Sequence, residues 1–163
     1  MNIIIAIIIL LAYTIFACAY GHKIPKSLST SVYQLPAWGR PVWTAVLVVI
    51  AFLMVPSFID ATADYFRVLA FIACASLGFV AGSPLTVKSK MGMGLAVHAW
   101  GAIICGIASQ LAIALTAPLY LLCWLPFLGY FVYVKANHLT FRTVLFWAEM
   151  TAFFTTFFFC LFF

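Results

Sequence analysis

Apolar segments long enough to cross a bilayer take up almost the whole chain and are separated by short polar loops. A transmembrane helix needs about 20 predominantly apolar residues. Only 7% of the 163 residues are charged and 67% are hydrophobic, whereas a water-soluble domain carries about 25% charged residues. The sequence therefore predicts an all-α, polytopic transmembrane bundle of six spans without a soluble domain. The spans are expected at about 2–20, 42–59, 67–84, 94–116, 119–134 and 143–163.

The first apolar segment, 2–20, has the length of either a signal peptide or a span. No positive residue precedes its apolar run, and Lys23 and Lys26 follow it, which is the reverse of the order in a signal peptide. We therefore expect an uncleaved first span.

The longest predicted loop, 21–41, contains the serine-rich stretch SLSTSVYQL (27–35) between two prolines. Leu28, Val32 and Leu35 fall on one side if this stretch is helical. Two interpretations stay open: a short interfacial helix on the membrane surface, or a flexible serine-rich loop.

Basic residues are segregated among the loops, since every Lys and Arg except Arg67 falls in the first, third or fifth loop. The positive-inside rule then places these loops in the cytoplasm and both termini outside, in what we expect to be a bacterial inner membrane. The same side chains are candidate contacts for anionic lipid headgroups: Lys23, Lys26, Arg40, Lys88, Lys90, Lys135 and Arg142. Four tryptophans are expected at this interface, where aromatic rings prefer to lie: Trp38, Trp43, Trp100 and Trp147.

The span at 94–116 has one bulky and one small face, each recurring at steps of three and four residues. Membrane helices associate where small residues let backbones come close, so we expect the small face to point into the bundle. The bulky face consists of Trp100, Ile103, Ile104, Ile107, Leu111 and Leu115, and the small face of His98, Ala102, Cys105, Ser109, Ala112 and Thr116.

Three stretches resemble an uncharacterised group of small multi-pass membrane proteins of gut Bacteroidota and their phages. They are SLSTSVYQL (27–35), FIACASLGFVAG (71–82) and VHAWGAIICGIASQL (97–111). That group has no assigned activity, so the resemblance implies neither catalytic residues nor a substrate.

Two ionisable residues lie inside predicted spans, where they are costly and therefore indicate function by default. His98 lies about one turn, and Glu149 about two turns, inside the cytoplasmic ends of their spans. Both lie on small faces at similar depth, which predicts an intramembrane polar pair. The pair would either fix helix packing or serve as a proton relay, substrate contact or pore lining.

The predicted outer turn between the second and third spans carries Asp60, Asp64 and Arg67 at four- and three-residue spacing. We expect a solvated helix start with a local ion pair; the alternative is an acidic vestibule for cations. Gln110 is expected to form an interhelical hydrogen bond.

Several chemistries are disfavoured. Zinc catalysis needs three protein ligands, but His98 stands alone in its span and the other histidines lie in loops. The five cysteines lie in apolar segments without CxxC spacing, and no nucleophile or phosphate-binding motif is present. We expect no metal, no cofactor and no nucleic acid, because loop cations are explained by membrane orientation.

Three classes of function remain open. The preferred hypothesis is a non-enzymatic membrane module that acts through helix packing, self-assembly as a homo-oligomer, or binding of a membrane protein partner. One alternative is a small channel or carrier for an ion or small solute that uses His98 and Glu149. The other is a membrane-embedded, lipid-active enzyme.

Overall fold

A computed structural model of the chain describes residues 2–86 and 93–163. Its six α-helices are α1 (Asn2–Gly21), α2 (Gly39–Ala61), α3 (Arg67–Thr86), α4 (Met93–Thr116), α5 (Leu125–Ala136) and α6 (Val144–Phe162). Short 3₁₀ helices lie between them: η1 (Ser29–Gln34), η2 (Asp64–Phe66), η3 (Pro118–Trp124) and η4 (Phe141–Thr143). No strand occurs in this part of the chain, so the predicted all-α class is confirmed.

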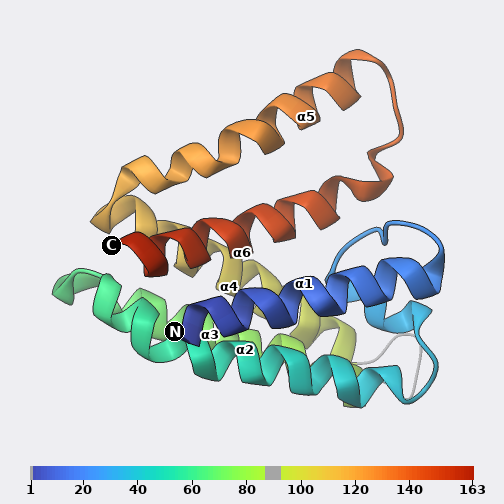
Figure 1. Cartoon of the computed structure of the whole chain (residues 1–163), viewed down its shortest axis with the longest axis horizontal. Coiled ribbons are helices and arrows are strands. Elements are labelled where there is room, and N and C mark those ends of the chain that lie inside the picture. Colours follow the sequence, from blue (N-terminus) through green and yellow to red (C-terminus); the bar gives the residue numbers. More distant parts are fainter. Residues whose placement is uncertain (1, 87–92) are drawn as a thin grey trace.

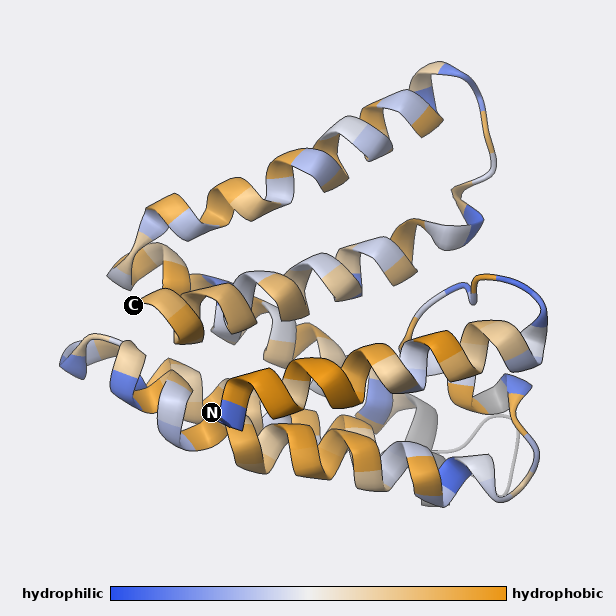
Figure 2. Ribbon diagram, in the orientation of Figure 1, coloured by the Kyte–Doolittle hydropathy of each residue, from blue (hydrophilic) through white to orange (hydrophobic). Residues whose placement is uncertain are grey.

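Six helical segments are long and apolar enough to cross a membrane, as the sequence predicts. The fifth of them joins η3 to α5 and covers Pro118–Ala136. The helices consist mostly of apolar residues, and polar residues concentrate in the connections (Figure 2). Both termini lie at the same end of the bundle (Figure 1).

The closest helix pairing, between α3 and α4, depends on small residues. A Cβ placed on Gly101 would lie 3.2 Å from Val80 Cγ2 and 3.3 Å from the carbonyl oxygen of Ser76. Ala81 and Ala112 are completely buried. Small side chains allow this approach because helices in lipid gain van der Waals contact only where their backbones come near.

The predicted rotation of α4 is confirmed. All six residues of its bulky face are exposed, with Trp100 at 65% and Ile107 at 63%. His98, Ser109 and Ala112 on the small face are buried.

The loop at 21–41 contains a short helix, as the first of its two interpretations expects, but the apolar side of this helix packs against other helices of the bundle. Its central part folds into η1, which packs against α1 and α2 and buries Leu28, Ser31 and Val32 almost completely. The Tyr13 and Ser31 hydroxyls lie 2.8 Å apart, and the backbone N–H of Phe146 donates to the Lys26 carbonyl. The segment can enter the bundle because its serine hydroxyls bond locally: Ser27 and Thr30 exchange backbone and side-chain hydrogen bonds, as in a capping box.

Helix α5 stands apart from the other five (Figure 1). Only 6% of the apolar segment Pro118–Ala136, which contains α5, is buried, against 28–44% of the other five segments. Two hydrogen bonds attach α5 to the other helices: Trp124 Nε1, just before its first residue, donates to Gln110 Oε1 at 2.8 Å, and the Tyr130 hydroxyl in its middle lies 2.9 Å from the Thr143 hydroxyl.

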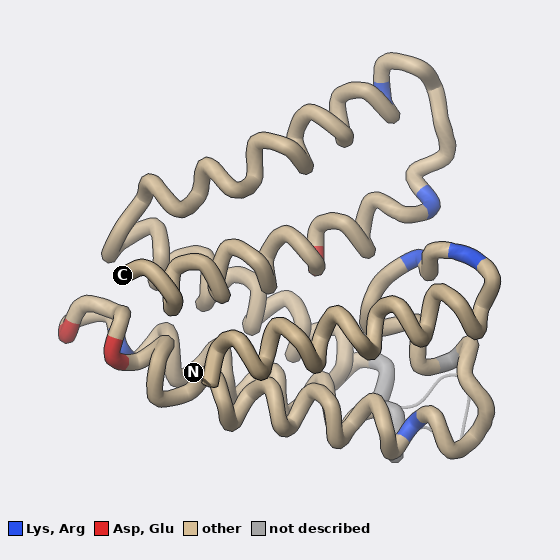
Figure 3. The backbone as a smooth tube through the Cα atoms, in the orientation of Figure 1, with Lys and Arg blue, Asp and Glu red and all other residues tan. Residues whose placement is uncertain are grey.

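The described Lys and Arg residues, apart from Arg67, lie at one end of the bundle (Figure 3). We call the end with the described Lys and Arg side chains of the first and fifth loops, Lys23, Lys26, Arg40, Lys135 and Arg142, the basic end. The turn between α2 and α3, with Asp60 and Asp64, lies at the other end.

Candidate functional site

Glu149 on α6 is bound by the start of η1. One carboxylate oxygen, Oε2, accepts hydrogen bonds from the backbone N–H groups of Leu28 and, at 3.4 Å, Ser29. The other, Oε1, accepts from the Ser29 hydroxyl at 2.9 Å. N–H groups in the first turn of a helix lack intrahelical partners, so the carboxylate satisfies donors that would otherwise be buried without one. Glu149 thereby fixes the inserted segment to α6.

His98 at the start of α4 has its partners on α3. Its Nδ1 lies 2.7 Å from the Ser83 hydroxyl oxygen, and that hydroxyl donates to the Val80 carbonyl at 2.9 Å. The side chain is 7% exposed, and its Nε2 has no hydrogen-bond partner among the described residues.

The contact expected between His98 and Glu149 does not form: within the described ranges, no hydrogen bond or ion pair joins them. The sequence predicts a similar depth for the two residues, but depth does not fix the direction in which a side chain points around its helix. The carboxylate points to the inserted η1 segment, which offers backbone donors, and the imidazole points to α3. The two residues therefore belong to separate polar contacts.

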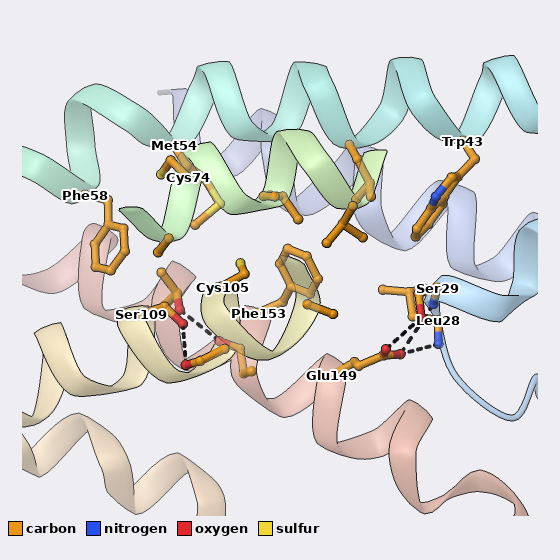
Figure 4. A pocket seen from close by; sticks show the side chains of 18 residues that line it. Leu28, Ser29, Trp43, Met54, Phe58, Cys74, Cys105, Ser109, Glu149 and Phe153 are labelled. Atoms are coloured by element: carbon orange, nitrogen blue, oxygen red, sulfur yellow. Dashed lines mark hydrogen bonds between the residues drawn. The ribbon is translucent and has the colours of Figure 1, made fainter. Parts of the chain in front are cut away.

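A cavity runs between α6 and the layer formed by α2, α3 and α4, and Glu149 lies at one of its ends (Figure 4). Its lining comprises Leu28, Ser29, Trp43, Leu47, Met54, Phe58, Ala73, Cys74, Leu77, Val80, Ala102, Cys105, Gly106, Ser109, Glu149, Ala152, Phe153 and Thr156. Most of these side chains are apolar. The volume is about 110 Å³.

The cavity is long relative to the membrane. Its lining on α2 extends from Trp43 to Phe58, which corresponds to about 22 Å at 1.5 Å per residue. The hydrocarbon core of a bilayer is about 30 Å thick. The cavity therefore follows most of the membrane-spanning part of the bundle.

Polar groups are confined to the two ends of the cavity. Ser29 and Glu149 lie at the end near the basic residues. Toward the other end lie the lining residues Ser109 and Thr156. Gln110, which is outside the lining, donates through Nε2 to the Ala152 carbonyl at 3.3 Å and to the Thr156 hydroxyl at 3.4 Å. The predicted interhelical role of Gln110 is confirmed, because it joins α4 to α6 and, through Trp124, to η3.

Trp43 is the functional candidate that sequence reasoning misplaced. The three other tryptophans assigned to the interface are 41–65% exposed, but Trp43 is 1% exposed. Its ring packs on Tyr13, with centroids 4.9 Å apart. It stands at the same end of the cavity as Ser29 (Figure 4). Its Nε1–H has no hydrogen-bond partner in the described part of the chain, although buried tryptophans usually find one.

The outer turn is a solvated helix start with a local ion pair, as the sequence favoured. Arg67 and Asp64 form an ion pair of 2.9 Å, with side chains 48% and 80% exposed. Asp60 is exposed as well. An exposed pair of this kind contributes little to stability.

The candidate lipid contacts Lys23, Lys26, Arg40, Lys135 and Arg142 are all exposed. Lys26 and Arg142 border a shallow depression together with Leu145. Lys88 and Lys90 lie outside the described residues.

The described residues offer no group of three His, Cys, Asp or Glu side chains that could hold a metal ion. Ser29 touches a carboxylate, but a serine nucleophile also needs free N–H donors for the developing oxyanion. The nearby N–H groups of Leu28 and Ser29 already donate to Glu149. This arrangement binds and positions groups; it does not resemble an acyl-transfer centre.

No family model matches the chain, and neither the curated proteins nor the solved structures contain a significant match.

Proposed function

We propose that this protein is a non-enzymatic membrane module that binds the hydrocarbon chain of a lipid-like molecule inside its bundle. The observation that carries the proposal is the long apolar cavity with polar groups at its ends. Apolar cavities remain dry and accept apolar guests. An apolar cavity of about 150 Å³ binds benzene, so 110 Å³ accommodates about four carbon-sized groups. A short stretch of a single hydrocarbon chain matches this size.

Packing drives this binding. A chain that leaves the bilayer for the cavity exchanges one apolar environment for another, so it gains no hydrophobic transfer energy. A void in a protein interior costs about 24 cal/mol per Å³. For 110 Å³ the cost is about 2.6 kcal/mol, and a well-fitting chain can recover it.

The proposal can be tested by photolabelling in lipid nanodiscs with a decane derivative that carries a diazirine in mid-chain. We expect adducts on Cys105 and Phe153, which line the cavity, besides adducts on lipid-facing Ile107. Ala102→Phe fills the cavity and should lower the ratio of inner to outer labelling severalfold. Ala75→Phe, on an exposed position of α3, is the matched control and should leave the ratio unchanged. Absence of inner adducts would refute the proposal.

The channel hypothesis receives less support from this geometry. A permeating ion needs carbonyl or charged ligands to replace its water. Between Glu149 at one end and Ser109 at the other, the lining side chains are apolar or weakly polar. We expect proteoliposomes with the protein to show no more K⁺ or Cl⁻ flux than empty liposomes.

A second candidate is assembly with another copy or another membrane protein through α5. The supporting observation is that only 6% of the apolar segment Pro118–Ala136, which contains α5, is buried, with Leu128 and Val132 exposed at 50% and 63%. Single cysteines at these positions in a cysteine-free background should form cross-linked dimers in membranes. Cysteines at exposed positions of α3, such as Val68, should not.

We further propose that the basic end faces the cytoplasm and contacts anionic lipids. The support is that every described Lys and Arg except Arg67 lies at one end of the bundle (Figure 3), together with the positive-inside rule. Each basic residue near an anionic surface contributes about 1 kcal/mol to such attraction.

A further inference from the structure

Two basic side chains from opposite parts of the sequence border one depression at the basic end. Its lining consists of Lys26, Thr140, Phe141, Arg142 and Leu145. Lys26 belongs to the first loop, whereas the other four residues lie at the start of the last helical segment or directly before it. None of the lining residues is acidic, so the depression carries two positive charges.

The packing of the bundle holds these two side chains close together. The backbone N–H of Phe146 donates to the Lys26 carbonyl at 3.2 Å. Arg142 lies four residues before Phe146, which is one helical turn or about 6 Å along the helix axis. Glu149, about one turn further along α6, fixes the residues that follow Lys26 through its hydrogen bonds. The long side chains of Lys26 and Arg142 can therefore reach a common ligand.

Neither cation has a counter-ion within the part of the chain that the structure describes. The ion pair found there joins Arg67 to Asp64 in the turn between α2 and α3. The Thr140 hydroxyl is also available, because it makes no capping hydrogen bond to the helical turn that it precedes. Two cations and a hydroxyl donor suit an anion with several acceptor oxygens, such as a phosphate group.

The depression also has an apolar side. Phe141 and Leu145 are 51% and 58% exposed, and their four-residue spacing places them on one face of a helix. The sixth apolar segment begins at Phe141, so the depression lies where the hydrocarbon core of a bilayer ends and its headgroups begin. A phospholipid would use both the cations and the apolar side, whereas inorganic phosphate would use the cations alone.

We propose that this depression binds the phosphate group of an anionic phospholipid. The phosphate oxygens accept hydrogen bonds from Lys26, Arg142 and Thr140, and the planar guanidinium pairs with two of them. The glycerol and the first acyl carbons lie against Phe141 and Leu145. This inference rests on the proposed contact between the basic end and anionic lipids, and it assigns that contact to one defined site.

The net charge of the headgroup decides the selectivity of this site. Phosphatidylglycerol and phosphatidylethanolamine carry the same phosphodiester. The ethanolamine ammonium, however, adds a positive charge beside Lys26 and Arg142, and like charges repel. The site therefore prefers phosphatidylglycerol, although both lipids offer the same phosphate oxygens and the same acyl chains.

Native mass spectrometry of the full chain with each of these two lipids tests the site. We expect the first phosphatidylglycerol to bind about tenfold more tightly than the first phosphatidylethanolamine. Lys26→Gln and Arg142→Gln should each weaken phosphatidylglycerol binding about fivefold, because each removes one cation beside the anionic group. The matched controls Lys23→Gln and Arg40→Gln remove exposed cations of the basic end that lie outside the depression, and they should have little effect.

Conservative variants distinguish ligand binding from a structural role. Arg142→Lys keeps the charge but loses the two-pronged contact, so its loss should be smaller than that of Arg142→Gln. Thr140→Val removes the hydroxyl and should weaken binding about threefold, whereas Thr140→Ser should bind like the wild type. Both side chains are exposed, so Tm in the absence of added lipid should stay unchanged in all of these variants.

The outcomes separate the two proposals. Equal binding of the two lipids by the wild type would refute the proposed anionic contact and the site with it. A preference for phosphatidylglycerol that Lys23→Gln and Arg40→Gln weaken as much as Lys26→Gln does would leave a diffuse contact and refute the site. We expect incubation with inorganic phosphate to leave bound phosphatidylglycerol in place; its displacement would identify free phosphate as the ligand and overturn the lipid assignment.

Discussion

Two alanines on the same face of α4 should respond in opposite ways to the same enlargement. Ala102 lines the cavity, whereas Ala112, ten residues further along the helix, is fully buried in packed core. The sequence treats them alike, because both lie on the small face that is expected to point into the bundle. The structure predicts that only Ala112 rejects a larger side chain.

The magnitudes follow from the volume of the cavity. Filling all of the 110 Å³ would recover at most about 2.6 kcal/mol. A leucine at position 102 fills only part of it, so Ala102→Leu should stabilise the protein by about 1 kcal/mol. Ala112→Leu has no void to fill, and overpacking of this kind costs about 1–3 kcal/mol. The two variants should therefore differ in sign.

Thermal unfolding in one detergent, followed by intrinsic fluorescence, measures the contrast. One kcal/mol corresponds to about 2–4 °C in Tm for a chain of this size. We expect Ala112→Leu to lower Tm by roughly 2–12 °C and Ala102→Leu to raise it by a few degrees. Ala75→Leu on the exposed side of α3 is the control and should change little. Equal losses at positions 102 and 112 would refute the cavity as the structure describes it.

Three further predictions concern the polar residues and the topology. Glu149→Leu should destabilise the protein by about 1–3 kcal/mol, since it leaves buried N–H donors of η1 unpaired, and Glu149→Gln should cost less because its amide oxygen still accepts; equal losses in thermal stability would contradict the observed contact. His98→Leu combined with Glu149→Leu should give additive losses within about 0.5 kcal/mol, because the two side chains have separate partners; a double-mutant cycle with larger coupling would restore the predicted pair. In a cysteine-free background, a membrane-impermeant maleimide added to intact cells should label Ala63→Cys but not Asn137→Cys, and the reverse result would invert the proposed topology.

The apolar stretches and the three- and four-residue repeats of the sequence predicted the helices correctly. The apolar stretches gave six spans because backbone groups in lipid must be satisfied within helices. The two faces of α4 were read correctly because a three- and four-residue repeat is a property of the helix itself. The α2–α3 turn with its Arg67–Asp64 pair is local too. These features depend on residues close together in sequence.

The site depends on contacts that no local pattern contains. Glu149 bonds to residues 28 and 29, about 120 positions away in the chain, and nothing in the periodicity of α6 indicates that a loop enters the bundle there. Trp43 follows Pro41 at the start of a span, where the same sequence also suits an interfacial anchor. Trp43 is buried because η1 packs into the bundle. The Ser31 hydroxyl of η1 contacts Tyr13, and the Tyr13 ring covers the indole ring of Trp43. A serine-rich segment with three apolar residues on one side is compatible with a surface helix and with a buried plug. The η1 segment is buried because the Glu149 carboxylate supplies the acceptor that its backbone N–H donors need.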